Sequence, residues 1–397
     1  MLTTVKSQAT RLAQRMGNLG TETAFVVLAK ARELERQGRS IIHLEIGEPD
    51  FDTPAHIIDE AVRALRSGVT HYGPAGGLPE AREAIARYVS ETRGVKVGPE
   101  RVVITPGAKP IMFFGIIALV DEGDEVIYPN PGFPIYESAI RFFGGCPIPI
   151  PLREENDFRL DVEELMSLVT DRTKLIIINS PQNPTGGILT RADLEAVGRL
   201  AVDRGIYVLA DEIYSRIVYD SEFESILHAV PEALDQVILL DGMSKTFAMT
   251  GWRLGWGVMA PDLAAAVERL QTNSTSCTAT FSQKVIGPAL FGPQEPVESM
   301  LSEFKKRRDL IVGGLNRIQG MTCRQPSGAF YVFPNITAWG LTSKLAADRL
   351  LQEAGVAALG GTAFGQMGEG YLRLSYANSI ENIEQALARI ERWVKEL

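Results

Sequence analysis

The chain has few of the residues that form disulfide frameworks and metal sites. Its 397 residues include only Cys146, Cys277 and Cys323, which lie far apart in the sequence and form no C-x-x-C pair. An odd number of widely spaced cysteines argues against a disulfide framework or a zinc site, and favours the buried thiols of a cytoplasmic protein. The four histidines show no metal-ligand spacing such as H-E-x-x-H. We therefore expect no bound metal and a cytoplasmic location.

Long apolar runs and an excess of positive charge are also missing. The longest apolar run, residues 111–120, is about half as long as a bilayer span requires. Residues 1–25 mix basic and polar side chains and lack the apolar core of a secretory signal. The formal net charge of −9 provides no basic surface for nucleic acid or for an anionic membrane. The sequence therefore predicts a protein that binds neither nucleic acid nor a membrane.

What the chain does have is a regular alternation of apolar and helical segments. Apolar runs rich in β-branched residues read as strands at 102–105, 125–128, 175–178, 207–210, 237–240 and 255–259. Helices are expected between them at 109–121, 160–169, 191–204 and 262–271, with Asp161 and Thr190 at two of their N-termini. Continuous apolar strands separated by helices predict an α/β fold, in which helices cover both faces of a mostly parallel sheet.

A second, smaller unit is expected in the C-terminal part of the chain. The composition changes at residues 292–296, which carry a glycine and two prolines and precede a long charged helix. The remainder reads as strand, helix, strand, strand and helix, and the last helix begins near Ile380. This pattern predicts a smaller α+β domain.

A lysine suited to covalent chemistry lies in the run from Asp241 to Gly255. Lys245 follows an apolar strand and is flanked by small residues, so its amine can form a Schiff base with a carbonyl group. Eight residues later Arg253, after a Gly-Trp turn, offers the planar fork that suits a phosphate. A solvated Lys–Arg surface pair is the ordinary alternative. The apolar and glycine-rich surroundings disfavour it.

Polar residues also follow two other predicted strands. Asp211 ends the strand at 207–210, and Asn183 follows the strand at 175–178. In open α/β sheets, ligands bind beyond the carboxyl ends of the strands. A carboxylate buried there requires a cationic partner, unless it only caps a helix. Together with Lys245, these residues predict one site at one edge of the sheet.

Taken in chain order from about Ile46 to Arg373, the motifs resemble those of class I aminotransferases. The closest resemblance is to the aspartate aminotransferase subgroup. The resemblance implies the fold-type I architecture and the cofactor pyridoxal 5′-phosphate, held by Lys245 as a Schiff base. It implies that Asp211 pairs with the pyridine nitrogen of the cofactor. Tyr214 and Asn183 are implied as hydrogen-bond donors to the ring oxygen.

The resemblance assigns further cofactor contacts. The phosphate is expected at the N-terminus of the helix at 109–121, and Phe133 is expected to stack on the ring unless it is a core phenylalanine. Many family members carry a serine where this chain has Gly242, so phosphate binding has to rely on the remaining donors. The residues expected to donate hydrogen bonds to the phosphate are Gly107, Ala108, Lys109, Ser244 and Arg253.

Substrate contacts are expected from residues in several segments. Arg373 interrupts an apolar strand, where an arginine is costly without an anionic partner. The resemblance implies that it clamps the substrate α-carboxylate, with Gly47 bringing its backbone close and Asn183 nearby. Lys109 is implied as a ligand of a distal carboxylate. Glu22 would neutralise Lys109 and repel such a carboxylate, or else it is a solvated surface residue.

The resemblance also bears on assembly and domain boundaries. Tyr72 looks like the tyrosine that reaches the phosphate of a neighbouring subunit, which implies a homodimer. The N-terminal segment is implied to join the C-terminal unit. We therefore predict an N-terminal arm and part of the small domain at 1–47, a large cofactor-binding domain at 48–294 and a small domain at 295–397.

The expected activity is transfer of an amino group between an L-amino acid, with aspartate the first expectation, and a 2-oxo acid such as 2-oxoglutarate. The two half-reactions imply ping-pong kinetics through pyridoxamine phosphate. Alanine, aromatic or other neutral donors are alternatives, as are a β-lyase or a cyclopropane-carboxylate synthase on the same fold. An aminotransferase-like transcription regulator would need a basic DNA-binding extension, and only about 45 residues precede Gly47.

Overall fold

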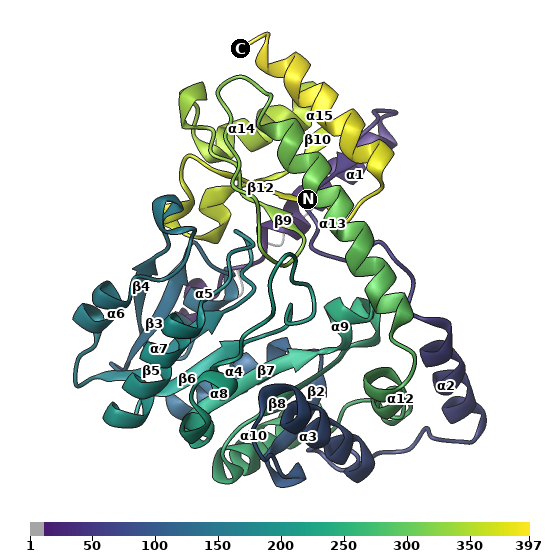
Figure 1. Ribbon diagram of the computed structural model, residues 1–397, viewed down its shortest axis with the longest axis vertical. Helices are drawn as coiled ribbons and strands as arrows, with labels where there is room; N and C mark the ends of the chain where they lie inside the picture. The colour runs from purple at the N-terminus through teal and green to yellow at the C-terminus, as the bar shows by residue number, and fades with distance from the viewer. Residues whose placement is uncertain (1–11) are drawn as a thin grey trace, which may run out of the picture.

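The computed structural model describes residues 12–397, in which a seven-stranded sheet forms the centre of the larger part (Figure 1). All strands run parallel except β8, which is antiparallel to both of its neighbours. The predicted α/β class and mostly parallel sheet are confirmed. In spatial order the strands are β2 (Val102–Pro106), β8 (Leu254–Val258), β7 (Val237–Gly242), β6 (Tyr207–Asp211), β5 (Thr173–Asn179), β3 (Glu125–Asn130) and β4 (Cys146–Pro151).

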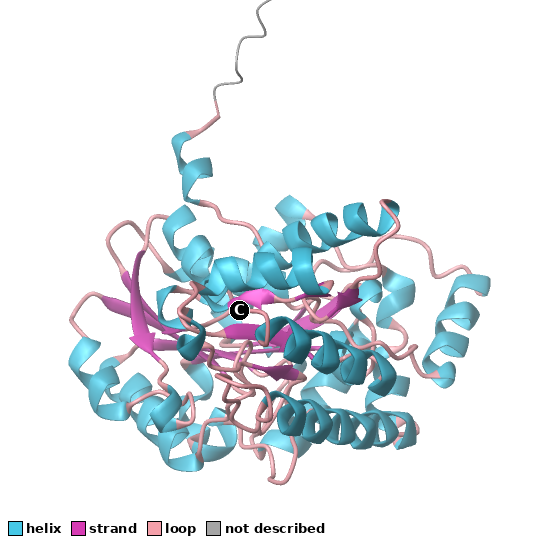
Figure 2. Ribbon diagram, turned by 90° about the horizontal axis from the view of Figure 1, so that it is seen from above, coloured by secondary structure: helices cyan, strands magenta, loops and turns pink. Residues whose placement is uncertain are grey.

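Helices cover both faces of this sheet, and Figure 2 shows the strands running between them. Neighbouring side chains of a strand point to opposite faces. In β5, Leu175 and Ile177 accordingly join the core under α4 (Lys109–Leu119) and α10 (Pro261–Ser274), whereas Ile176 and Ile178 join the core under α3 (Pro79–Arg93) and α7 (Arg191–Arg204). This double burial explains why the strand sequences are continuously apolar.

The two residues predicted at helix N-termini, Asp161 and Thr190, are confirmed as capping residues. The Asp161 side chain accepts a hydrogen bond from the backbone N–H of Glu164 and caps α6 (Val162–Leu168). Thr190 and Asp193 form a capping box at the start of α7. Strand β4 was not predicted, because its sequence CPIPIP contains three prolines. It pairs only with β3 at the edge of the sheet, where a missing backbone N–H is tolerated.

The smaller unit packs around the pair α13–α15, which run side by side in Figure 1. Its strand pattern has one short strand more than predicted, because β10 and β11 flank the single residue Ala358. Its elements are α13 (Glu295–Leu315), β9 (Tyr331–Val332), α14 (Ser343–Arg349), β10 (Val356–Ala357), β11 (Leu359–Gly360), β12 (Leu372–Ser375) and α15 (Ile380–Val394).

The N-terminal segment joins this smaller unit. Strand β1 (Ile42–His43) pairs in parallel with β10, with Ile42 opposite Val356. Helix α1 (Thr23–Arg36) packs its buried Ala31 and Leu34 against the same unit. The first eleven residues of the predicted arm lie outside the described part of the chain. The boundaries at 47/48 and 294/295 remain predictions.

Within residues 12–397, no helix combines the length and the hydropathy needed to cross a membrane. The same residues contain no group of three or more histidine, cysteine or acidic side chains arranged to hold a metal ion. The remaining helices are α2 (Ala55–Arg66), α5 (Ile135–Phe142), α8 (Ile226–Ala229), α9 (Met243–Thr246), α11 (Thr280–Gln283) and α12 (Ile286–Phe291).

Candidate active site

A cavity of about 500 Å³ lies beyond the carboxyl ends of β5, β6 and β7, where the sequence predicts a site. Residues of α1, α4 and β12 complete its wall. Two predicted site residues are not part of the lining: Gly107, which precedes the lining residue Ala108, and Tyr72, which is 90% exposed. The predicted residues that line it are Gly47, Ala108, Lys109, Phe133, Asn183, Asp211, Tyr214, Ser244, Lys245, Arg253 and Arg373.

Lys245 enters the cavity from α9, directly after β7. Its Nζ donates a hydrogen bond to the backbone oxygen of Gly47 at 2.6 Å, and it lies about 6 Å from the ring centres of Tyr214 and Phe330. Burial in these surroundings lowers the pKa of Lys245 to about 8. The amine is therefore much closer to its neutral, nucleophilic form at pH 7 than a surface lysine is.

Gly242 lies where two neighbouring strands of the sheet approach closely. It ends β7 opposite Gly255 of β8. A Cβ atom at Gly242 would lie 2.9 Å from the Cα of Gly255 and 3.1 Å from the backbone oxygen of Leu254. Because backbone atoms of a central strand cannot easily move away, a serine at this position would disturb the sheet. The close approach of β7 and β8 thus excludes a hydroxyl-bearing side chain at this position.

Asp211 points into the cavity from the end of β6. Its carboxylate accepts a hydrogen bond from the Tyr136 hydroxyl at 2.6 Å and one from the backbone N–H of Ile213 at 3.3 Å. Burial raises the pKa of Asp211 to about 6, against the lowering effect of these two donors. A cation bound beside it would stabilise the ionised form. Sequence reasoning missed Tyr136, since nothing marks one tyrosine in an ordinary helix as a partner of a distant strand end.

Two tyrosines form one wall of the cavity. The hydroxyl groups of Tyr214 and Tyr331 lie 2.7 Å apart, and burial raises the pKa of both phenols. The Tyr331 hydroxyl occupies the space that a side chain at Gly47 would need, so the backbone can approach only with glycine there. Sequence reasoning also missed Tyr331, because it reads as part of a plain apolar strand.

Arg373 carries a buried positive charge into the cavity from β12. Its Nη2 donates to the backbone oxygen of Glu45, whereas its Nε has no hydrogen-bond partner. The ring of Tyr331 lies 4.5 Å from the guanidinium carbon, and burial lowers the pKa of Arg373. No carboxylate among the described residues forms an ion pair with this side chain. A buried guanidinium in this state is a strong binding site for a carboxylate ligand.

Arg253 and the start of α4 form a second anion-binding corner. Arg253 adopts the left-handed conformation, with φ of 53°, and donates to the backbone oxygens of Thr250 at 2.8 Å and Pro106 at 3.3 Å. Its guanidinium fills the space beside Gly107, where a larger residue would collide with it. The first N–H groups of a helix have no intrahelical acceptor and attract anions. This corner therefore suits a phosphate.

Asn183 supplies a further unpartnered group. Its backbone N–H donates to the Asn179 side chain at 2.9 Å, but its own Oδ1 is buried without a hydrogen-bond partner. Buried polar atoms of proteins are nearly always hydrogen-bonded. The two orphaned groups in this cavity, on Asn183 and Arg373, therefore indicate ligand-binding positions. Together with the lysine, the buried carboxylate and the phosphate corner, they fit pyridoxal phosphate and an amino acid.

Phe133 and Lys109 form the side of the cavity near α1. The ring of Phe133 meets Tyr136 edge-on at 5.7 Å and is partly buried, so it is available to a flat ligand. The Nζ of Lys109 lies 5.4 Å from the Phe133 ring centre. It also forms an ion pair with Glu22, which lines the cavity and is not the solvated surface residue of the alternative interpretation.

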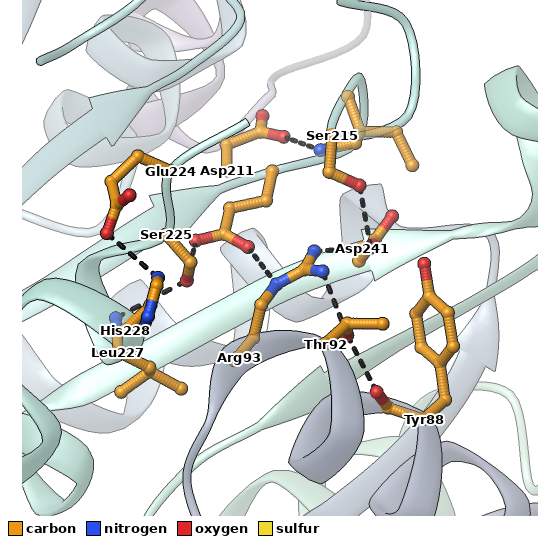
Figure 3. A network of polar contacts seen from close by, with 12 residues as sticks. Tyr88, Thr92, Arg93, Asp211, Ser215, Glu224, Ser225, Leu227, His228 and Asp241 are labelled. Atoms are coloured by element: carbon orange, nitrogen blue, oxygen red, sulfur yellow. Dashed lines mark hydrogen bonds and ion pairs between the residues drawn. The ribbon is translucent and has the colours of Figure 1, made fainter. Parts of the chain in front are cut away.

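A buried charge network supports the strand ends behind the cavity (Figure 3). Arg93, at the end of α3, donates to Glu212 at 2.9 Å and forms a 3.4 Å ion pair with Asp241. Hydroxyl groups complete the network, because Ser225 donates to Glu212 at 2.6 Å and Ser215 donates to Asp241 at 3.3 Å. Glu212 follows Asp211 in the chain, and Asp241 begins the run that carries Lys245. One guanidinium thus ties together the two segments that present those residues.

His43 is expected to make stability depend on pH. Its ring nitrogens contact the buried Glu45 at 2.7 Å and Glu35 at 3.1 Å, and the hydrogen bond with Glu45 is the main reason that its pKa rises to about 9. Since this pKa exceeds the unfolded value, the stabilisation is complete below about pH 6.5 and is lost as the pH rises toward 9.

Replacing His43 by glutamine should therefore remove on the order of 1 kcal/mol of stability at pH 6 and much less at pH 9.5. Urea unfolding of both proteins at the two pH values measures the difference. An equal loss at both pH values would contradict a charged His43–Glu45 pair.

Comparisons with known proteins cover most of the chain. A sequence model of the family described as aminotransferase class I and II matches residues 39–390. The chain is 42% identical over 362 residues to the aspartate aminotransferase of Pyrococcus abyssi, covering 90% of this chain and 92% of that protein. It is 40% identical to aromatic-amino-acid aminotransferase 2 of Thermococcus litoralis, covering 93% and 95%. The structure of aspartate aminotransferase from Thermus thermophilus with maleate matches with a TM-score of 0.93 at 38% identity, covering 97% and 100%.

Proposed function

Since the chain belongs to the class I and II aminotransferases, which are pyridoxal-phosphate enzymes, we propose that it transfers the amino group of aspartate to a 2-oxo acid such as 2-oxoglutarate. The observation that carries this proposal is the presence of two separate cations for two substrate carboxylates. Arg373 is buried without an anionic partner, and Lys109 lines the same cavity. Relatives named for aspartate support the same donor, and one solved relative holds maleate, a dicarboxylic acid.

The cofactor-binding roles follow from the geometry of the cavity. Pyridoxal phosphate supplies a reactive aldehyde carbon and a ring that withdraws electrons from the substrate. We assign the phosphate to Ser244, Arg253 and the N-terminal amides of α4 at residues 107–109. Asp211 would face the ring nitrogen of the bound cofactor, where its buried carboxylate would gain a cationic partner. Tyr214 and the side-chain amide nitrogen of Asn183 would donate to the ring oxygen, and Phe133 would cover one face of the ring.

Lys245 is assigned both covalent attachment and proton transfer. Its amine has a pKa of about 8 because of burial, so a useful fraction is a free base near neutral pH. That base removes the proton from the substrate Cα and returns a proton later in the half-reaction. Arg373 clamps the α-carboxylate in a bidentate pair, with Asn183 and the backbone of Gly47 beside it, and so fixes the Cα–H bond relative to the amine.

A homodimer is part of the same proposal. Tyr72 is 90% exposed and lies outside the cavity of its own chain. An exposed tyrosine of this kind can reach the phosphate site of a neighbouring copy, as the family resemblance implies. The proposed active form is then a dimer in which each copy contributes Tyr72 to the site of the other.

The donor can be identified from single half-reactions. We expect aspartate, mixed with the enzyme in the absence of a 2-oxo acid, to convert the bound cofactor to pyridoxamine phosphate faster than alanine or phenylalanine does. Absorbance and mass spectrometry measure the conversion. A faster reaction with phenylalanine would favour the aromatic alternative, as the name of the Thermococcus litoralis relative suggests. Release of ammonia without pyridoxamine phosphate would favour a β-lyase.

A further inference from the structure

The side chain of Glu22 points away from the helix that it precedes. It occupies the N-cap position of α1, yet it accepts no capping hydrogen bond from that helix. Short polar side chains such as those of serine, threonine, aspartate and asparagine normally cap a helix, and the longer glutamate side chain is not among them. Glu22 instead forms an ion pair with Lys109, the first residue of α4, on the other side of the cavity wall. The carboxylate of Glu22 therefore faces the cavity and not its own helix.

The Glu22–Lys109 pair is the only ion pair between a cation and a carboxylate in the described lining of the cavity. Four cations line it, and among the residues of the described chain only Lys109 has an ion pair with a carboxylate. The negative charge of Glu22 also acts deeper in the cavity. Burial lowers the pKa of both Lys245 and Arg373. The negative charge of the Glu22 carboxylate opposes this effect, because it favours the charged form of each side chain and so raises each pKa.

We propose that Glu22 determines substrate specificity, because its carboxylate occupies Lys109 whenever the bound amino acid has none to offer. The inference rests on the proposed function of the cavity. Amino acids with uncharged side chains bind with the Glu22–Lys109 pair intact. Dicarboxylic acids bind only after their distal carboxylate has displaced Glu22 from Lys109. One site can then accept both classes, so that the dicarboxylic substrates of the proposed reaction bind without excluding amino acids that have an uncharged side chain.

The surroundings of the pair suit both states. Glu22 and Lys109 expose 20% and 41% of their side chains, so either can turn toward water without the full penalty of an isolated buried charge. Phe133 lies beneath Lys109, and apolar residues including Phe25 and Met112 line the cavity close to the pair. An apolar or aromatic substrate side chain therefore meets a neutral ion pair and apolar walls.

The test uses Glu22→Gln, which removes the charge and preserves the size of the side chain. Calorimetry with the holoenzyme measures the dissociation constants of succinate, with two carboxylates, and of butyrate, with one. We expect succinate to bind roughly tenfold more tightly to E22Q, because it no longer displaces or faces a carboxylate. Butyrate should change by less than about twofold.

Two further variants complete the design. Lys109→Met, alone or combined with E22Q, should remove the gain for succinate, since no cation remains to be released. Glu33→Gln removes an exposed carboxylate of the same helix, outside the cavity, and should change neither constant. Unchanged succinate binding in E22Q, or an equal gain for butyrate, would overturn the proposal. Failure of the proposed function is recognised separately, as the absence of pyridoxamine phosphate with any amino acid.

Discussion

Replacing Lys245 by alanine is expected to abolish amino transfer, with a loss of at least about 10⁴-fold in kcat. Proton transfer by a positioned side chain alone contributes about 10²–10⁴-fold, and covalent attachment of the cofactor is lost in addition. The side chain is the one amine with a strongly lowered pKa in the cavity, and it lies among the rings of Tyr214 and Phe330. No other described lysine of the lining faces those rings, since Lys109 is paired with Glu22.

The measurement is turnover with aspartate and 2-oxoglutarate, together with the absorbance of the bound cofactor. In the alanine variant that absorbance should be that of free pyridoxal phosphate, and gel filtration should remove more of the cofactor. The matched control is Lys30→Ala, which breaks an exposed pair with Asp348 and should leave both readouts unchanged. Undiminished turnover in the Lys245 variant would disprove the assignment.

The sequence was sufficient for the parts of this site that local patterns encode. A strand buried on both faces must be continuously apolar, so the positions of β5, β6 and β7 were readable, and with them the positions of Asn183, Asp211 and Lys245 at their ends. Thr190 and Asp161 were readable as caps because a cap involves residues only three positions apart. In these cases the signal and its partner lie close together in the chain.

Contacts between segments that lie far apart in the chain could not be predicted from the sequence. Tyr136 bonds to Asp211 across 75 positions, and Tyr331 bonds to Tyr214 across 117. Either tyrosine could have been an ordinary core residue. The proline-rich strand β4 was missed for another reason, since local propensity is overridden at a sheet edge, where the N–H groups on the outer side of the strand have no neighbouring strand to bond. Glu22 was visible as an acidic residue, but only the fold turns it toward Lys109 rather than toward its own helix.

Arg93 illustrates the same limit and leads to the second large effect. It is the last residue of α3, a position where a basic side chain ordinarily stabilises the helix dipole. In the fold it is the only cation paired with Glu212 and Asp241 among the described residues (Figure 3). Replacing Arg93 by methionine should therefore destabilise the protein by about 3–5 kcal/mol, because two buried carboxylates lose their partner.

The loss should also depend on pH, in a direction set by Asp241. Burial raises the pKa of this carboxyl to about 7, although Arg93 acts to lower it. A folded pKa above the unfolded value means that stability decreases as the pH rises from about 4 through the folded pKa. Without Arg93 the folded pKa rises further, so the decrease extends to higher pH. Urea unfolding at pH 6 and pH 9 should show a larger deficit of the methionine variant at pH 9.

Two variants separate this network from a general effect of losing an arginine. Arg87→Met removes an exposed arginine of the same helix, whose nearest carboxylate is Glu91 at 3.6 Å, and should change stability by no more than about 1 kcal/mol. Adding Asp241→Asn to the Arg93 variant should restore part of the stability and remove most of the added pH dependence, since one unpaired charge is gone.

The Arg93 variant should also lose cofactor more readily, because Glu212 and Asp241 anchor the segments that present Asp211 and Lys245. A deficit no larger than that of the Arg87 variant, equal at both pH values, would show that this guanidinium does not hold the two strand ends together.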